Sequence, residues 1–223
     1  LSEKNMIDSQ DLEVPNSLTQ ETVKSVFHWT DRMFSFRISR PATFRFRSGE
    51  FVMLGLFCDG VPLLRAYSIS SPAWDDELEF FSIEVQGGPL TSRLQHISSG
   101  DKLLLGKKST GTLTLDALSP AQTVYMFSTG TGIAPFVSLI RDPETFEKFQ
   151  SVVLTHTCRT VAELQYGYEI VAALRVDPFI DQFVGNKLVH YTAVTQETYH
   201  RVGRITTRIE SGQLFDEIKK APL

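Results

Sequence analysis

Short runs of alternating apolar and polar residues dominate the first half of the chain, as in antiparallel strands with one buried face. Glycine, proline, serine and aspartate cluster between the runs, which is typical of tight turns. One segment, residues 91–97, has a short helical pattern instead. Strands this dense around a single helix predict a small antiparallel β-barrel. The expected strands cover residues 23–29, 33–38, 50–57, 63–70, 78–85 and 102–106.

After Gly111 the pattern changes to buried strands that alternate with helices. This alternation indicates a parallel sheet with right-handed crossovers. The expected strands cover residues 124–128, 151–155 and 188–194, and the helices 133–141, 161–174 and 205–210. We therefore predict two domains after a short tail: residues 1–16 as the tail, 17–112 as the barrel and 113–223 as the α/β domain.

Composition narrows the functional classes. The 223 residues carry a formal net charge of −4, so the chain has no overall attraction to nucleic acid or to an anionic membrane. No apolar run is long enough to span a bilayer, and the N-terminal sequence is not that of a secretory signal. Its two cysteines, Cys58 and Cys158, follow no metal or disulfide spacing, which favours a cytoplasmic protein without a metal site.

The motif Arg65-Ala66-Tyr67-Ser68 ends one of the predicted barrel strands. Alternation along a strand places Arg65 and Tyr67 on one face and Ala66 and Ser68 on the other. A cationic group, an aromatic ring and a hydroxyl therefore meet at one strand end. This combination suits a ligand that carries both an anion and a flat ring.

Two glycine-containing turns are candidates for binding through main-chain atoms. In GPLTS at 88–92, unpaired N–H groups at a helix start favour anionic oxygen, and the alternative is an ordinary helix cap by Thr91 or Ser92. In STGTGIAP at 128–135, a buried strand turns into a helix at the carboxyl edge of the parallel sheet. This second segment matches neither a dinucleotide fingerprint nor a phosphate-binding P-loop, and a plain tight turn is its alternative.

Arginines follow the second and third predicted parallel strands. Arg159 lies in HTCRT at 156–160, and Arg204 lies after the next strand. Together they could bind a phosphate monoester, although surface arginines are more often only solvated. We interpret His156 and Cys158 as packed strand-end residues, because spacing identifies no nucleophilic partner for either.

These four motifs, in this order, resemble the bacterial type of the flavin-dependent ferredoxin or flavodoxin NADP reductases. The resemblance runs from about residue 20 to the chain end and includes His156 to Tyr166 with its spaced Arg159. It implies an FAD-binding barrel followed by an NADP-binding α/β domain. It also implies hydride transfer from NADPH to flavin N5 and one-electron exchange with an acidic carrier, ferredoxin or flavodoxin. We expect the protein to be a monomer.

The resemblance implies roles for residues on the FAD side. Arg65 and its neighbour Ala66 would bind FAD, with Arg65 on the phosphates. Tyr67 would stack on the isoalloxazine, Ser68 would hydrogen-bond near N5, and Thr131 would lie where flavin and nicotinamide meet. Tyr67, Ser68 and Thr131 would thus surround the reacting atoms. The other FAD contacts would come from Ser82, Ile83, Glu84, Pro89, Leu90 and Thr91.

On the NADP side the resemblance implies Cys158, Arg159, Thr195 and Arg204. The two arginines would bind the 2′-phosphate and favour NADPH over NADH. Relatives often have arginine where this chain has Gln196, so one cationic contact would be lost.

The chain ends at Leu223, before the strand, helix and tail that complete the nicotinamide site in the family. A chain that truly lacked them would have an incomplete parallel sheet with an exposed edge. Two other functions stay open: a flavin reductase or oxygenase reductase on the same fold, or a nucleotide-binding module without catalysis. A fused iron–sulfur centre is excluded, because a cluster needs about four cysteine ligands.

Carrier docking suggests a cationic face. No acidic residue interrupts residues 37–47, which contain four arginines, and three lysines follow in the barrel. We expect this face to receive the carrier, with a charge-protected strand edge as the alternative. The residues are Arg37, Arg40, Arg45, Arg47, Lys102, Lys107 and Lys108.

Overall fold

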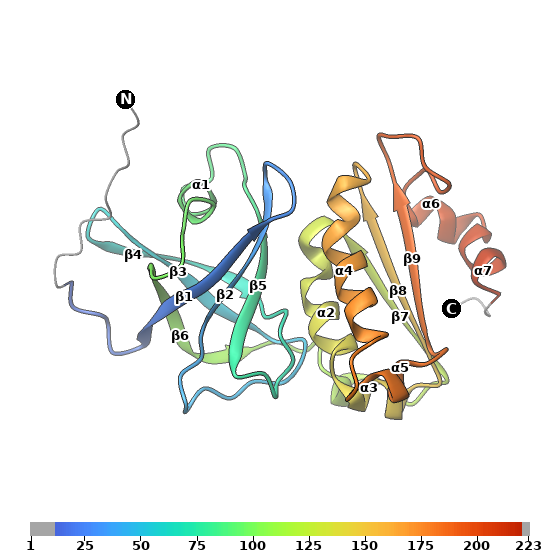
Figure 1. The fold of residues 1–223 in the computed structure, drawn as a ribbon, viewed down its shortest axis with the longest axis horizontal. Helices are drawn as coiled ribbons and strands as arrows, with labels where there is room; N and C mark the ends of the chain where they lie inside the picture. The colour runs from blue at the N-terminus through green and yellow to red at the C-terminus, as the bar shows by residue number, and fades with distance from the viewer. Residues whose placement is uncertain (1–11, 220–223) are drawn as a thin grey trace.

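The computed structural model describes residues 12–219 and contains two sheets of different kinds (Figure 1). Residues 12–16, the described part of the expected tail, form no helix or strand. Six antiparallel strands follow in the order β4-β3-β6-β1-β2-β5. Their bounds are β1 Leu18–His28, β2 Met33–Ser39, β3 Phe51–Cys58, β4 Val61–Ser68, β5 Glu77–Ile83 and β6 Lys102–Thr110.

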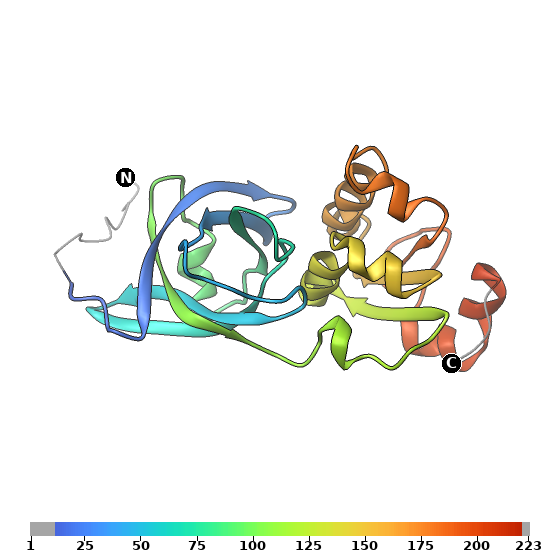
Figure 2. The same ribbon diagram turned by 90° about the horizontal axis from the view of Figure 1, so that it is seen from below.

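The edge strands β4 and β5 approach each other and close this sheet into the expected barrel. Just after β4, the Ser70 N–H donates to the Glu79 carbonyl of β5 over 2.8 Å. Figure 2 shows the strands curving around a shared interior. Helix α1 (Thr91–Leu94) ends earlier than the predicted 91–97 and contributes buried Leu94 to this interior. Stacked rings fill much of the core, among them Phe34, Phe36 and Phe80.

The second sheet is parallel, in the order β7-β8-β9. Its strands are β7 Thr123–Thr129, β8 Ser151–Cys158 and β9 Leu188–Val194, as the buried apolar runs predict. Helices α2 (Ala134–Ile140) and α4 (Gln165–Leu174) lie on the barrel side, and α6 (Ile205–Glu210) and α7 (Gln213–Ile218) cover the opposite face (Figure 1). Short turns η1 Leu115–Ala117, η2 Gly130–Ile133 and η3 Ala162–Leu164 connect these elements.

Helices α2, α4 and α6 confirm the three predicted helices, but α3 (Pro143–Lys148), α5 (Asp181–Val184) and α7 were not predicted. Helix α3 has a readable start, because the Asp142 side chain accepts from the Glu144 N–H and proline occupies the first turn. All three are six residues or shorter, too short to produce a recognisable apolar period. No helix within residues 12–219 is both long enough and apolar enough to cross a bilayer.

The two domains share one apolar core. Met33 of β2 and Phe81 of β5 belong to the same buried cluster as the α/β domain. The Phe81 ring stacks on the Tyr166 ring of α4, with centroids 4.0 Å apart. Burial of aromatic surface between the domains therefore holds β5 against α4.

A buried carboxylate adds a polar connection at the same junction. Glu79 accepts from Arg37 of the barrel over 3.1 Å, from Arg141 over 2.8 Å and from the Tyr166 hydroxyl over 2.9 Å. Nearby, the Ser138 hydroxyl donates to the Ser71 carbonyl over 2.7 Å. The position of α2 and α4 relative to β5 is thus specified by directional contacts as well as by packing.

Removing this carboxylate should destabilise the protein. Glu79→Ala should lower the free energy of unfolding by about 3 kcal/mol, because the Arg141 side chain, 16% exposed, would lose its carboxylate partner. Glu77→Ala is the matched control, since Glu77 is more exposed and Arg37 keeps Asp75 and Glu79; its cost should stay below about 1 kcal/mol. Urea denaturation followed by fluorescence measures both. Equal losses would contradict the special role of Glu79.

Candidate functional site

The end of strand β4 places Tyr67 at the seam where the barrel closes. Its hydroxyl lies 3.2 Å from the Ser82 hydroxyl of β5, and its ring meets the Phe80 ring edge-on. Burial raises the pKa of the Tyr67 phenol, so the hydroxyl stays protonated at neutral pH. The structure thus brings Tyr67 and Ser82 together, as expected of one binding surface, with Ser68 half-buried beside them.

Arg65 carries a charge that no carboxylate balances within the described residues. The side chain is exposed, and its guanidinium donates to the Leu64 carbonyl over 2.8 Å. Ala66 beside it is also exposed. An anion at this strand end would therefore meet a cation without displacing an ion pair.

The GPLTS segment forms a tight loop, and the alternative of an ordinary helix cap is wrong. The cap position of α1 is Leu90, whose side chain makes no capping bond, and Leu90 is buried in the barrel. The Thr91 hydroxyl instead accepts from the Val85 N–H over 3.1 Å. A Cβ at Gly88 would come within 2.6 Å of that hydroxyl and 2.9 Å of the Val85 carbonyl oxygen, so only glycine permits this close turn. Pro89 stays exposed on it.

Strand β5 leads into this loop through Ile83 and Glu84. The main chain of Glu84 is already engaged, because its N–H donates to the Arg32 carbonyl and its carbonyl accepts from the Arg32 guanidinium over 2.7 Å. Of the three expected contacts, Ser82 lies at the seam, Ile83 packs against the apolar cluster of the α/β domain, and Glu84 follows the end of β5.

The STGTGIAP segment makes the turn η2 at the carboxyl end of β7 and rests against β5 of the barrel. Gly130 has φ +51°, a left-handed conformation that glycine adopts freely, and an added Cβ there would lie 3.8 Å from Cε of Met33. Thr131 follows and is half-buried. The turn from one domain thus meets the strand next to the seam of the other.

Next to this turn, strand β8 ends in a contact between a histidine and a cysteine two residues apart. His156 Nε2 lies 3.1 Å from Cys158 Sγ and 3.2 Å from the Gly130 carbonyl oxygen. Burial lowers the pKa of His156 to about 3 and raises the pKa of Cys158 to about 12, so the two groups are neutral. A thiol in this state is not an activated nucleophile, which agrees with the interpretation of both as packed strand-end residues.

The ends of β8 and β9 lie side by side and carry the expected NADP-side residues. The Thr195 N–H donates to the Cys158 carbonyl over 3.0 Å, and the Gln196 N–H donates to the Arg159 carbonyl over 2.9 Å. The Gly203 N–H bonds the Val194 carbonyl, which brings Arg204 to the same edge. The four residues named by the sequence therefore gather at one edge of the sheet.

The arginines of this region divide by their partners. Arg201 and Arg208 both bind Glu217, at 2.7 Å and 2.6 Å. Arg159 and Arg204 are exposed and make no ion pair within residues 12–219. Their charges are therefore available to an anionic ligand, whereas those of Arg201 and Arg208 are compensated.

Two loop carboxylates were missed by the sequence reasoning. Glu163 accepts from the Arg159 N–H over 2.8 Å, and Glu197 accepts from the Val161 N–H over 2.6 Å. Both bonds order the loops around Arg159. The i, i+4 spacing of Arg159 and Glu163 was a possible signal, but the bond from Val161 to Glu197 spans 36 residues and leaves no local trace.

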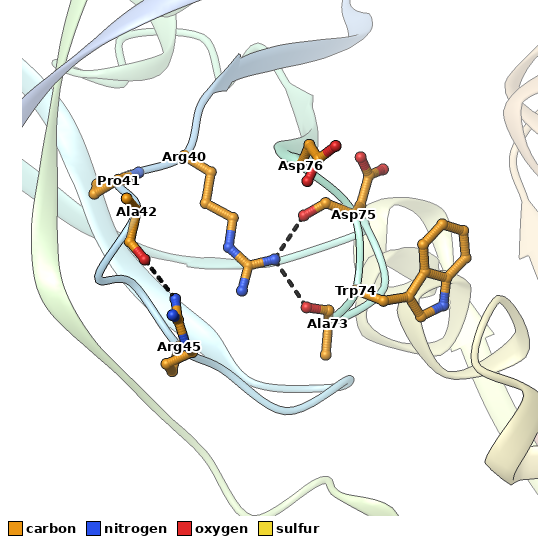
Figure 3. Close-up of a pocket in the computed structure, with 8 residues that line it drawn as sticks. All are labelled: Arg40, Pro41, Ala42, Arg45, Ala73, Trp74, Asp75 and Asp76. Carbon is orange, nitrogen blue, oxygen red and sulfur yellow. Dashed lines mark hydrogen bonds between the residues drawn. The ribbon is translucent and has the colours of Figure 1, made fainter.

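Two of the four arginines on the expected cationic docking face are paired with carboxylates. Arg37 binds Asp75, Glu77 and Glu79, and Arg47 binds Glu50 and Asp116. Arg40 and Arg45 line a pocket of about 250 Å³, where they donate to main-chain carbonyls (Figure 3). Asp75 and Asp76 border the same pocket, so this surface is mixed in charge.

Comparison with known proteins identifies close relatives. The sequence model of the oxidoreductase FAD-binding domain family matches residues 19–114. The flavodoxin/ferredoxin–NADP reductase of Rhodobacter capsulatus is 56% identical over 204 residues, which cover 91% of this chain and 76% of that protein. The ferredoxin–NADP reductase of Azotobacter vinelandii is 50% identical over 208 residues, covering 93% and 81%.

A solved structure supports the same relation in three dimensions. The crystal structure of a ferredoxin NADP⁺ reductase from Neisseria gonorrhoeae with bound FAD and NADP superimposes with a TM-score of 0.84 at 27% identity. The match covers 94% of this chain and 82% of that one. The similarity therefore includes both domains.

The raised pKa of Cys158 predicts an unreactive thiol. At pH 8 a thiol with a pKa of about 12 is about one part in ten thousand thiolate, whereas an ordinary cysteine is about one quarter thiolate. In Cys58→Ser protein, labelling by a chromogenic disulfide should therefore be slow until denaturant is added, and should accelerate as pH rises toward 12. Rapid labelling near neutral pH would show an ion pair with His156 instead.

Proposed function

The chain belongs to the ferredoxin/flavodoxin–NADP reductase family, and on that premise we propose that it is an FAD-dependent reductase. It would exchange electrons between NADPH and a one-electron carrier, ferredoxin or flavodoxin, as the names of its relatives indicate. One observation carries the proposal: turn η2 of the α/β domain lies against β5, the strand that contributes Ser82 to the barrel seam. Surfaces suited to a flavin and to a nicotinamide thus adjoin at the domain junction.

The residues of the barrel fit FAD. Arg65 offers an uncompensated cation for phosphate, and the Val85 to Thr91 loop closes through a glycine that no other residue could replace without a clash. Tyr67 supplies an aromatic face at the seam, with Ala66, Ser68, Ser82 and Ile83 around it. We assign the pyrophosphate contact to Arg65 and to the loop containing Pro89, Leu90 and Thr91.

The edge formed by β8 and β9 fits NADP(H). Arg159 and Arg204 are exposed there and have no carboxylate partner among the described residues, and two guanidinium groups suit the dianionic 2′-phosphate. Cys158 and Thr195 hold the two strand ends together beneath them. We therefore propose a preference for NADPH over NADH.

When bound, FAD supplies the hydride and one-electron chemistry that side chains lack. The chain binds and orients the two cofactors and excludes water from between them. Tyr67, fixed by Ser82, would hold the ring system, Ser68 would donate a hydrogen bond beside it, and Thr131 would bring the α/β domain to the same place. Because the Tyr67 phenol stays protonated, it orients and does not act as a base.

Three further assignments complete the proposal. We place the domain boundary between residues 112 and 113, which is supported by the end of β6 at Thr110 and by the family match to 114. Cys58 and Cys158 are both free, which suits a reducing cytoplasm. We propose that the enzyme acts as a monomer, since its two cofactor surfaces come from one chain.

An absorption spectrum tests the proposed activity. The purified protein should be yellow, and NADPH should bleach it anaerobically. The reduced protein should then reduce added ferredoxin or flavodoxin. Fast reduction of free flavin without transfer to either carrier would indicate a flavin reductase. Colourless protein that binds NADP⁺ without turnover would refute the enzyme and support a binding module.

Nucleotide preference tests the two arginines. Arg159→Ala combined with Arg204→Ala should lower kcat/KM for NADPH by at least about 100-fold, because each charged contact contributes about 1.5–3 kcal/mol, while kcat/KM for NADH should change by less than about threefold. Arg201→Ala is the matched control, because Glu217 already holds Arg201; the NADPH to NADH ratio should stay unchanged. Equal losses with both nucleotides in the double variant would remove the 2′-phosphate assignment.

A further inference from the structure

The imidazole of His156 lies at the meeting point of four elements. It stands on β8, contacts the Gly130 carbonyl of η2, faces His190 of β9 and packs against Gly167 of α4. Its side chain is fully buried. None of the proposed cofactor contacts uses this residue, yet it touches the turn that carries Thr131.

The hydrogen-bond pattern assigns the tautomer. Nε2 has two neighbours, the Gly130 carbonyl oxygen at 3.2 Å and Cys158 Sγ at 3.1 Å, whereas buried Nδ1 has no partner within the described residues. A hydrogen on Nε2 is therefore donated to the carbonyl. The opposite tautomer would bury an N–H without an acceptor and leave the carbonyl without its donor.

Gly167 lets the helix approach the imidazole. A Cβ at this position would come within 2.8 Å of His156 Nδ1, 3.1 Å of Ile133 Cδ1 and 3.4 Å of His190 Nε2. Ile133 is the last residue of η2. Because Gly167 has a hydrogen in place of a Cβ, His156 and Ile133 can both pack against α4 at this position.

We propose that His156 is a positioning residue for electron transfer, which holds the Gly130–Ile133 turn through the Gly130 carbonyl and is itself held in place by Gly167. The turn carries Thr131, so its placement sets how the α/β domain presents its side of the junction to the barrel. The effect on electron transfer rests on the proposed function. The hydrogen bond to Gly130 and the packing against Gly167 do not depend on it. His156 reaches the proposed NADP side only through Cys158 Sγ, 3.1 Å from its Nε2, and transfers no proton.

If His156 positions the turn, the position of the turn should depend on pH only where a group facing the imidazole titrates. The titratable groups facing the imidazole are Cys158 from its own strand and His190 from β9, while α4 presents Gly167 and η2 presents a carbonyl. Burial, together with the charge of nearby Arg175, lowers the pKa of His190 to about 4. Both imidazoles therefore stay neutral from about pH 6 to pH 8, and the turn should keep its position throughout that range.

Two replacements of His156 separate the hydrogen bond from simple packing. His156→Gln places an amide N–H near the position of Nε2, and His156→Leu fills the space without a donor. Flavin reduction by saturating NADPH, followed anaerobically by stopped flow, should slow by about 10- to 100-fold in the leucine variant and recover to within about threefold in the glutamine variant. The dissociation constant of NADP⁺ should change by less than about threefold in both.

Amide hydrogen exchange supplies a readout that needs no turnover. Peptides covering residues 129–135 should exchange faster in His156→Leu than in wild type, and at the wild-type rate in His156→Gln. Gly167→Ala, which pushes on the imidazole from α4, should reproduce the leucine phenotype without removing the donor. Its effect should not add to that of His156→Leu, because both act on one contact.

Several outcomes would overturn the inference. Unchanged exchange and unchanged reduction in His156→Leu would do so, as would a glutamine variant as slow as the leucine variant at equal thermal stability. A rate that titrates near pH 6.5 in wild type but not in His156→Gln would show acid–base catalysis instead. Wild-type protein that NADPH does not reduce would refute the proposed function, while the exchange measurement would still test the hydrogen bond.

Discussion

The carboxylate of Glu79 is the contact on which the geometry of the junction depends. It stands on β5 of the barrel but accepts hydrogen bonds from Arg141 and Tyr166 of the other domain. Contacts between domains are by default mobile, yet this one combines buried charge with an apolar core that continues from Phe81 to Tyr166. Opening the junction would expose both, so the barrel seam and the η2 turn keep a fixed relation.

The distribution of arginine partners separates cations that are free to meet an anion from cations that are already compensated. A guanidinium paired with carboxylates attracts an incoming anion only weakly, because its charge is already compensated. Substitution of such an arginine mainly affects stability. Arg37 and Arg208 are of this kind, each held by one or more glutamates. Arg65, Arg159 and Arg204 are exposed and carry no carboxylate partner within residues 12–219. The sequence alone does not distinguish these two groups of arginines. Their carboxylate partners in the structure do.

Local pattern predicted most of the fold. Alternation predicted the barrel strands and buried apolar runs predicted the parallel strands, of which β9 matches the predicted bounds 188–194. The same reasoning singled out the two glycine-containing turns, where Gly88 and Gly130 are favoured locally. It did not find the partners of Arg37, since Asp75, Glu77 and Glu79 lie on β5 or the loop before it, 38 to 42 residues away. The arginine run therefore suggested four free cations, two of which, Arg37 and Arg47, are paired with carboxylates.

The contact between His156 and Cys158 shows where such reasoning stops. Two residues apart on a strand, they must share a face, so their proximity was implied by alternation alone. Their chemistry was not, because a histidine beside a cysteine is an ion pair in a solvated site and a neutral pair in a buried one. Helix α4 decides between these states, since Gly167 lets it cover the imidazole completely. The same burial that removes nucleophilic chemistry from this pair keeps the imidazole neutral and hence able to hold the Gly130 carbonyl at any physiological pH.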